Sequence, residues 1–177
     1  MHIIIGFITA LAGLIWALNS LQNAGFDLNS LNPFALMRRR RWAKKLGTKP
    51  MHALKESSDA AALLVVSIAK ENGEITRDTK LEILSLFENE FGVNRKKSIE
   101  IFSSSAYLLE GVSNMSSEVK HVLKLSKEQF EQNHIEKLLK MLTIVSNLDH
   151  EPTSGQDEMI LAVKKEFNQD KLQGKNW

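Results

Sequence analysis

The chain has 177 residues, a net charge of +2 and no cysteine. This length suits one modest domain with an appendage, and the lack of cysteine excludes disulfides, thiolate metal sites and cysteine nucleophiles. The charge is unevenly distributed, because residues 28–55 hold eight basic residues and no acidic one, whereas the chain from Glu56 onward holds 15 basic and 20 acidic residues. The basic excess is therefore local, and the overall charge says little about partners.

An uncharged apolar run opens the chain. It extends from Ile3 to Leu21, which is about 19 residues and close to the roughly 20 that an α-helix needs to cross a bilayer. A cleaved signal peptide would carry a basic segment before this run, and only Met1 and His2 precede it. We therefore predict a retained transmembrane anchor over residues 1–22.

Small residues recur along this run at spacings of four, three and four. On a helix this spacing forms one stripe, which lets two membrane helices approach closely. The stripe predicts a dimer face and hence a homodimer, and the alternative is that glycine and alanine are simply common in membrane spans. The residues of the stripe are Gly6, Ala10, Gly13 and Ala17.

A basic connector follows over residues 23–50. The positive-inside bias places such a cluster in the cytoplasm, where anionic lipid is the nearest polyanion. We therefore expect a single-pass protein of the bacterial inner membrane, with its amino terminus outside, and lipid headgroups rather than nucleic acid as the partner of the cluster. Trp42 is placed at headgroup depth, with packing on the body as the alternative. The predicted headgroup residues are Arg38, Arg39, Arg40, Arg41, Trp42, Lys44 and Lys45.

The predicted body, residues 51–170, shows helical periodicity and no sustained alternation of period two, which indicates an all-α fold. Its organising stretch is residues 61–91. This stretch consists of an apolar helix, a turn at Asn72-Gly73, and an amphipathic helix that Thr76 caps and Gly92 ends. We expect much of the remaining helix to pack against this hairpin.

Further helices are predicted after the hairpin. Asn94 caps a third helix, which Gly111 stops. A shorter helix follows around residues 115–123. Ser126 and Gln129 match a capping box, which predicts that a long helix opens there.

The carboxyl-terminal part repeats the pattern of the central hairpin. A break at residues 149–152 precedes the last helix, and a polar tail covers residues 171–177. Shifting the sequence by 77 residues places the turn 72–76 over the turn 149–153. Both segments read as helix, polar turn, helix, so we predict that the two turns are structurally paired.

The motifs of these two turns resemble a known family. The segment AKENGEIT at residues 69–76, an amphipathic helix after it, and NLDHE at residues 147–151 are similar to the TerB-like (tellurite-resistance protein B) domain family. The resemblance covers residues 60–167 and implies a compact helical fold. A span before such a domain is similar to DjlA-type membrane co-chaperones, but this chain has no J-domain His-Pro-Asp motif, so recruitment of a chaperone ATPase is not implied.

The resemblance also implies an acidic metal site at the turns. This chain departs from the family pattern there, with Asn72 for Asp, His150 for Gly, and both Thr79 and Gln156 for Glu. A carboxylate-poor site binds a hard cation such as calcium weakly. We therefore expect either no cofactor or a weakly bound divalent cation, and the alternative is that the acidic residues are solvated helix-end charges. The candidate ligands are Glu71, Glu74, Asp149 and Glu151.

Other chemical signatures are excluded by the residue pattern. An EF-hand that places Gly73 at its invariant sixth position would have Ile68, Lys70 and Thr79 at positions one, three and twelve, which lack the required carboxylates. The five histidines show no His–His ligand spacing within one helix, the glycines form no phosphate loop, and no serine lies in a nucleophile elbow. We expect a protein that is not an enzyme.

The sequence favours two functions. The first is a membrane-anchored, TerB-like interaction module that faces the cytoplasm, binds another protein, and has a link to envelope or metal stress. The second is a divalent-metal sensor that uses the acidic residues of the two turns. The family name does not by itself establish a role in tellurite resistance.

Overall fold

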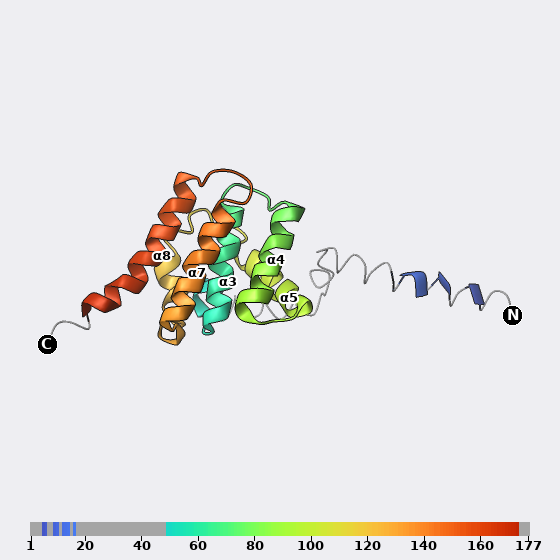
Figure 1. Cartoon of the computed structure of the whole chain (residues 1–177), viewed down its shortest axis with the longest axis horizontal. Helices are drawn as coiled ribbons and strands as arrows, with labels where there is room; N and C mark the ends of the chain where they lie inside the picture. Colours follow the sequence, from blue (N-terminus) through green and yellow to red (C-terminus); the bar gives the residue numbers. More distant parts are fainter. Residues whose placement is uncertain (1–4, 7–8, 11, 15, 17–48, 174–177) are drawn as a thin grey trace.

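The structure is a computed structural model that describes residues 5–6, 9–10, 12–14, 16 and 49–173. Within this part of the chain every regular element is a helix, which confirms the all-α prediction (Figure 1). The elements from residue 49 onward are η2 (Pro50–Ala53), α3 (Ser57–Lys70), α4 (Arg77–Phe91), α5 (Arg95–Leu108), α6 (Val119–Leu123), η3 (Lys127–Gln129), α7 (Gln132–Ser146) and α8 (Ser154–Gln173).

Helix α3 is the centre of the body. Every residue from Ala60 to Ile68 is buried, and the helix contacts α4, α5, α6 and α7. Figure 1 shows it between α7 and α4. A helix that is apolar on all sides is stable only when neighbours cover every face. The centre of the fold is therefore α3 alone rather than the whole hairpin of residues 61–91.

The predicted caps of the second and third helices are confirmed. The Thr76 hydroxyl accepts a hydrogen bond from the Thr79 backbone N–H at 3.1 Å. The Asn94 side chain accepts one from the Lys97 backbone N–H at 2.9 Å. Gly92 ends α4 in the left-handed conformation with φ 66°, which glycine adopts without a steric penalty. These short-range signals determine where α4 and α5 begin and where α4 ends.

The capping box predicted at Ser126 is wrong. Helix α7 begins six residues later, where the Glu131 side chain and the His134 side chain cap it reciprocally. Ser126 instead precedes η3, and its buried hydroxyl has no hydrogen-bond partner. The extended backbone of Phe130 separates η3 from α7, and its ring packs on the Phe167 ring of α8 with centroids 5.0 Å apart. This tertiary contact decides the start of α7.

The membrane location predicted from residues 1–22 is corrected. Among the described residues, no helix combines the length and the apolar character that a bilayer crossing requires. A span needs roughly 20 continuous residues of apolar helix. The described positions of the anchor are helical, and Gly6, Ala10 and Gly13 among them are exposed. The predicted single-pass inner-membrane topology, with the body in the cytoplasm, is therefore not retained.

Two predictions depended on that location. The predicted dimer stripe includes Ala17, and the predicted headgroup residues lie between positions 38 and 45. Ala17 and all of the headgroup residues lie outside the part of the chain that the structure describes. Both therefore stay predictions.

Candidate functional site

The two predicted turns lie side by side at one end of the bundle, where one joins α3 to α4 and the other joins α7 to α8 (Figure 1). Asn72 Nδ2 lies 2.8 Å from His150 Nε2, and Nδ1 of the same ring lies 2.8 Å from the Glu151 carbonyl oxygen. Because the carbonyl can only accept, the imidazole proton is assigned to Nδ1, and Nε2 accepts from the Asn72 amide. The predicted pairing of the turns is confirmed.

A chain of hydroxyl groups joins the first turn to Asp149. The buried Thr79 hydroxyl donates to the Asp149 carboxylate, with its oxygen 2.9 Å from Oδ1 and 2.8 Å from Oδ2. The Thr76 hydroxyl lies 2.7 Å from the Thr79 hydroxyl and donates to it, because the single proton of Thr79 points to the carboxylate. Asp149 therefore has a neutral protein partner.

Gln156 makes the corresponding link in the other direction. Its side chain is buried, and its Nε2 donates to the Ile68 carbonyl oxygen of α3 at 2.9 Å. Its Oε1 accepts from the Thr153 backbone N–H at 3.0 Å, and the Thr153 hydroxyl accepts from the Gln156 backbone N–H at 3.3 Å. Thr79 and Gln156, which correspond under the 77-residue shift, thus each bond across to the opposite helical hairpin.

The four predicted metal ligands are not brought together as a set. The carboxylate of Glu71 lies against Gly155 in the first turn of α8, where the helix dipole favours negative charge. Glu74 and Glu151 are exposed, and Asp149 is bonded to Thr79. In the described part of the chain, these residues provide no three ligand atoms within 4.8 Å of one another.

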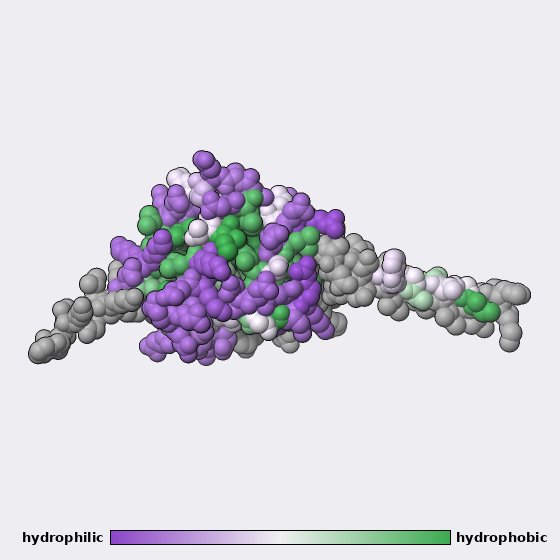
Figure 2. Space-filling view, in the orientation of Figure 1, coloured by the Kyte–Doolittle hydropathy of each residue, from purple (hydrophilic) through white to green (hydrophobic). Residues whose placement is uncertain are grey.

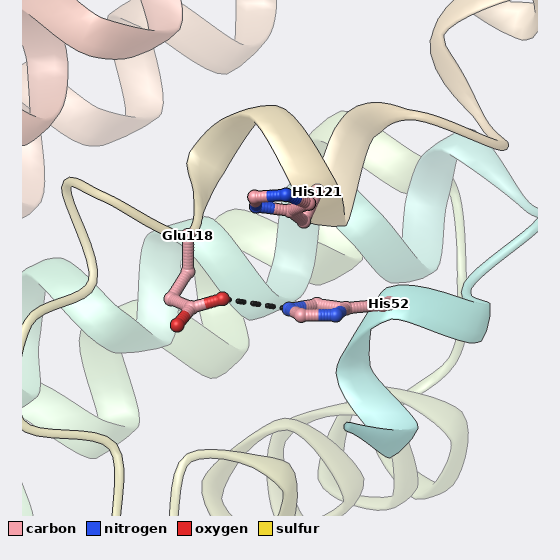
Figure 3. Close-up of side chains that lie close together, drawn as sticks. All are labelled: His52, Glu118 and His121. Atoms are coloured by element: carbon pink, nitrogen blue, oxygen red, sulfur yellow. Dashed lines mark hydrogen bonds and ion pairs between the residues drawn. The ribbon is translucent and has the colours of Figure 1, made fainter. Parts of the chain in front are cut away.

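A different cluster has such an arrangement: His52, Glu118 and His121 (Figure 3). His52 Nε2 lies 2.7 Å from Glu118 Oε2. The other carboxylate oxygen of Glu118 accepts a hydrogen bond from the Lys49 ammonium. The rings of His52 and His121 are stacked, with centroids 5.1 Å apart and planes inclined by 28°. One ligand atom from each of the three side chains lies within 4.8 Å of the other two.

Two short elements position this cluster. His52 belongs to η2, which packs against α6 and is held by the buried Met51. Glu118 is the N-cap residue of α6, and His121 lies three residues further, on the same helical face. The hydrogen bond from Lys49, followed by the one from His52, holds the pKa of Glu118 below its ordinary value of 4.5, although partial burial opposes this shift.

The sequence contained only half of the signal for this cluster. The spacing between histidines carries no such signal, because the local pattern is Glu118-x-x-His121, an i, i+3 pair that can bind one metal. His52 lies 66 residues before Glu118. No local pattern connects residues so far apart, and only the packing of η2 on α6 brings them together.

A shallow apolar groove runs between α7 and α8. Figure 2 shows apolar surface over these two helices, bordered by polar surface. Leu161 of α8 is 61% exposed and lies on the same helical face as Lys164. The residues that line the groove are Leu139, Lys140, Thr143, Ile144, Asn147 and Lys164.

Comparison with known proteins gives no relative. No protein-family model, no curated protein and no solved structure matches the chain.

Proposed function

We propose that residues 51–170 form a TerB-like helical domain without enzymatic activity, and that this domain binds another protein through the groove between α7 and α8. The occupant is an amphipathic helix with acidic residues along its edges. The observation that carries this proposal is the apolar groove with Lys164 in its lining and, three residues before Lys164 on α8, the exposed Leu161.

The groove has the chemistry that a helix-binding surface needs. Leu139 and Ile144 provide an apolar floor, and Lys140 and Lys164 stand on opposite helices. An amphipathic helix places apolar anchors at i, i+3, i+4 and i+7 into such a groove. Covering an exposed leucine such as Leu161 contributes about 1.5–3 kcal/mol. Lys164 adds a preference for acidic residues and a faster encounter, whereas Lys140 is already paired with Glu90 at 3.6 Å.

The resemblance to the TerB-like family is supported by the arrangement of the turns. The two turns that carry the family-like motifs lie together and are linked by the Asn72–His150 and Thr79–Asp149 hydrogen bonds. Thr79 and Gln156 occupy corresponding buried positions in the two hairpins. An internal repeat of two helical hairpins explains both observations.

Site-specific photocrosslinking in cells tests the binding surface. A photoreactive residue at exposed Thr143 in the groove is compared with one at Lys96, which is exposed on α5. We expect capture from position 143 only, a crosslinked peptide with amphipathic periodicity and acidic residues, and loss of capture in Leu161→Asp. Equal capture from both positions, or a basic crosslinked peptide, would contradict the proposal.

The alternative function, a divalent-metal sensor at the turns, has one observation in its favour, namely that the turns are adjacent and bonded to each other. It predicts that calcium raises the melting temperature of the full chain and that Asp149→Ala abolishes this effect. An unchanged melting temperature with calcium, magnesium and manganese would count against the sensor and leave the interaction proposal intact.

A further inference from the structure

We propose that His52, Glu118 and His121 bind one transition-metal ion of the Zn²⁺ type. This site is independent of the α7–α8 groove and of the acidic residues at the turns. It consists of one side chain from η2 and two from the turn that opens α6 (Figure 3).

The donor set selects the class of metal. Two imidazoles and one carboxylate are a common ligand set for zinc with an open fourth position. Calcium and magnesium prefer six or more oxygen ligands or several retained waters, and this cluster offers one carboxylate. Imidazole suits zinc, copper, iron and nickel. The cluster therefore favours a borderline transition metal over a hard cation.

The distances require only a small adjustment. Ligand atoms on a tetrahedral zinc ion lie roughly 3.3 Å apart, for bonds of about 2.0–2.1 Å. The three ligand atoms already lie within 4.8 Å of one another. His52 Nε2 and Glu118 Oε2 are 2.7 Å apart, so they separate by roughly 0.6 Å to reach that geometry. His121 is exposed and turns toward the ion, which leaves the fourth position to water.

The charge of Lys49 provides a test that distinguishes a metal site from a simple ion pair. Its ammonium bonds to Glu118 Oε1, and its side chain is 55% exposed. A cation bound to Glu118 Oε2 is repelled by this ammonium, and an exposed, flexible lysine moves away at little cost. Removing the lysine charge therefore strengthens metal binding, although it breaks a hydrogen bond in the metal-free protein.

The ion would fasten η2 to α6. Residues 49–53 meet α6 through η2, and Met51 is the buried residue of η2. Bound metal joins the two elements by bonds that the unfolded chain cannot form, so it stabilises the folded state by mass action. Acid reverses the effect, because the imidazoles must be neutral to bind the ion.

Calorimetric titration of the untagged full chain with Zn²⁺ tests the proposal, with Co²⁺ as a spectroscopic probe. We expect one metal per chain and the intense visible absorption of tetrahedral Co²⁺. Loss of a residue that merely supports a ligand costs roughly 10- to 100-fold in metal affinity. We therefore expect His52→Ala and His121→Ala each to weaken binding at least about tenfold.

Matched controls separate this site from others. His134→Ala removes an exposed histidine on α7, and Asp149→Ala removes the turn carboxylate, and both are expected to leave zinc affinity unchanged. Lys49→Met is expected to tighten binding, whereas Lys124→Met, at the other end of α6, has a smaller effect. Circular dichroism of each metal-free variant checks that it is folded.

Several results would overturn the site. These are no saturable binding, binding that survives His121→Ala and so reflects adventitious surface histidines, or weaker binding in Lys49→Met. His121 is the decisive position, because its side chain is exposed and its replacement leaves the core intact. None of these results bears on the groove, so the interaction proposal stands or falls separately.

Discussion

The paired turns and the His52–Glu118–His121 cluster are both polar, and both join segments far apart in the sequence. At the turns, Thr79 bonds Asp149 across 70 residues, and Gln156 bonds Ile68 across 88. In the cluster, Glu118 bonds His52 across 66. The turns are held by hydrogen bonds in which at least one partner is neutral, whereas the cluster combines a carboxylate, an ammonium and two imidazoles.

This difference separates a structural junction from the proposed metal site. At the turns the buried side chains, Thr79 and Gln156, have their hydrogen-bonding groups satisfied within the protein. In the cluster, the imidazole of exposed His121 makes a ring contact and offers a nitrogen lone pair to solvent. We therefore expect substitutions at the turns to lower stability, and substitutions in the cluster to alter its response to pH and metal.

The largest expected effect comes from Gln156→Ala. The substitution leaves the buried Ile68 carbonyl without its side-chain partner and removes a capping interaction of α8. The Ile68 carbonyl keeps a long hydrogen bond from the Glu71 backbone N–H at 3.4 Å, so the lost hydrogen bond costs about 0.5–1.5 kcal/mol and the lost cap about 1. The free energy of unfolding should fall by about 1.5–2.5 kcal/mol in urea denaturation. Gln132→Ala, an exposed glutamine on α7, is the control and should change it by less than about 0.5 kcal/mol.

Thr79→Val should have the next largest effect. Valine keeps the shape of the side chain but loses the hydroxyl that donates to Asp149 and accepts from Thr76. A hydrogen bond to a charged group contributes about 1.5–3 kcal/mol, and this is reduced because Asp149 is exposed, so we expect a loss of about 1–2 kcal/mol. An unchanged denaturation midpoint would show that the junction does not depend on this bond.

Glu118→Gln should change the pH dependence of stability more than stability itself. The pKa of Glu118 is lower in the folded protein than its ordinary value of 4.5. Its carboxylate therefore contributes stability above pH 4.5, and this contribution is lost as the pH falls through the lowered folded-state pKa. Denaturation midpoints between pH 3 and pH 7, about the range of carboxyl titration, should fall less steeply in the variant than in the native chain. Parallel curves for the two proteins would contradict the expectation.

The smallest effect on stability is expected at Ser126, three residues after the end of α6. Its buried hydroxyl has no hydrogen-bond partner. Replacing it by alanine removes a desolvated polar atom, so Ser126→Ala should leave stability unchanged or raise it by about 0.5 kcal/mol. Ser98→Ala is the matched contrast, because the Ser98 hydroxyl donates to the Leu84 carbonyl oxygen at 2.8 Å. That variant should lose about 1 kcal/mol, and equal behaviour of the two serines would show that Ser126 has a partner in solution.

Much of the helical body was predictable because its signals are local. Thr76, Asn94 and Gly92 act on the backbone within three residues, so the caps and the turn could be identified without knowing the fold. The pairing of the turns was also predictable, because the 77-residue echo relates two similar hairpins. The start of α7 was not, because Ser126 with Gln129 and Glu131 with His134 offer competing caps, and the contact between Phe130 and Phe167 decides between them.

By itself, the sequence determined the all-α class, both ends of α4, the start of α5, and the junction between the two turns. Periodicity, capping and turn chemistry depend on neighbours along the chain, and these are visible in any window of a few residues. Only the tertiary structure decided that α3 is buried on every side, that the predicted metal ligands stay apart, and that His52 meets Glu118 and His121. These outcomes depend on which helix faces pack together, and the packing of η2 on α6 joins side chains that no local pattern relates.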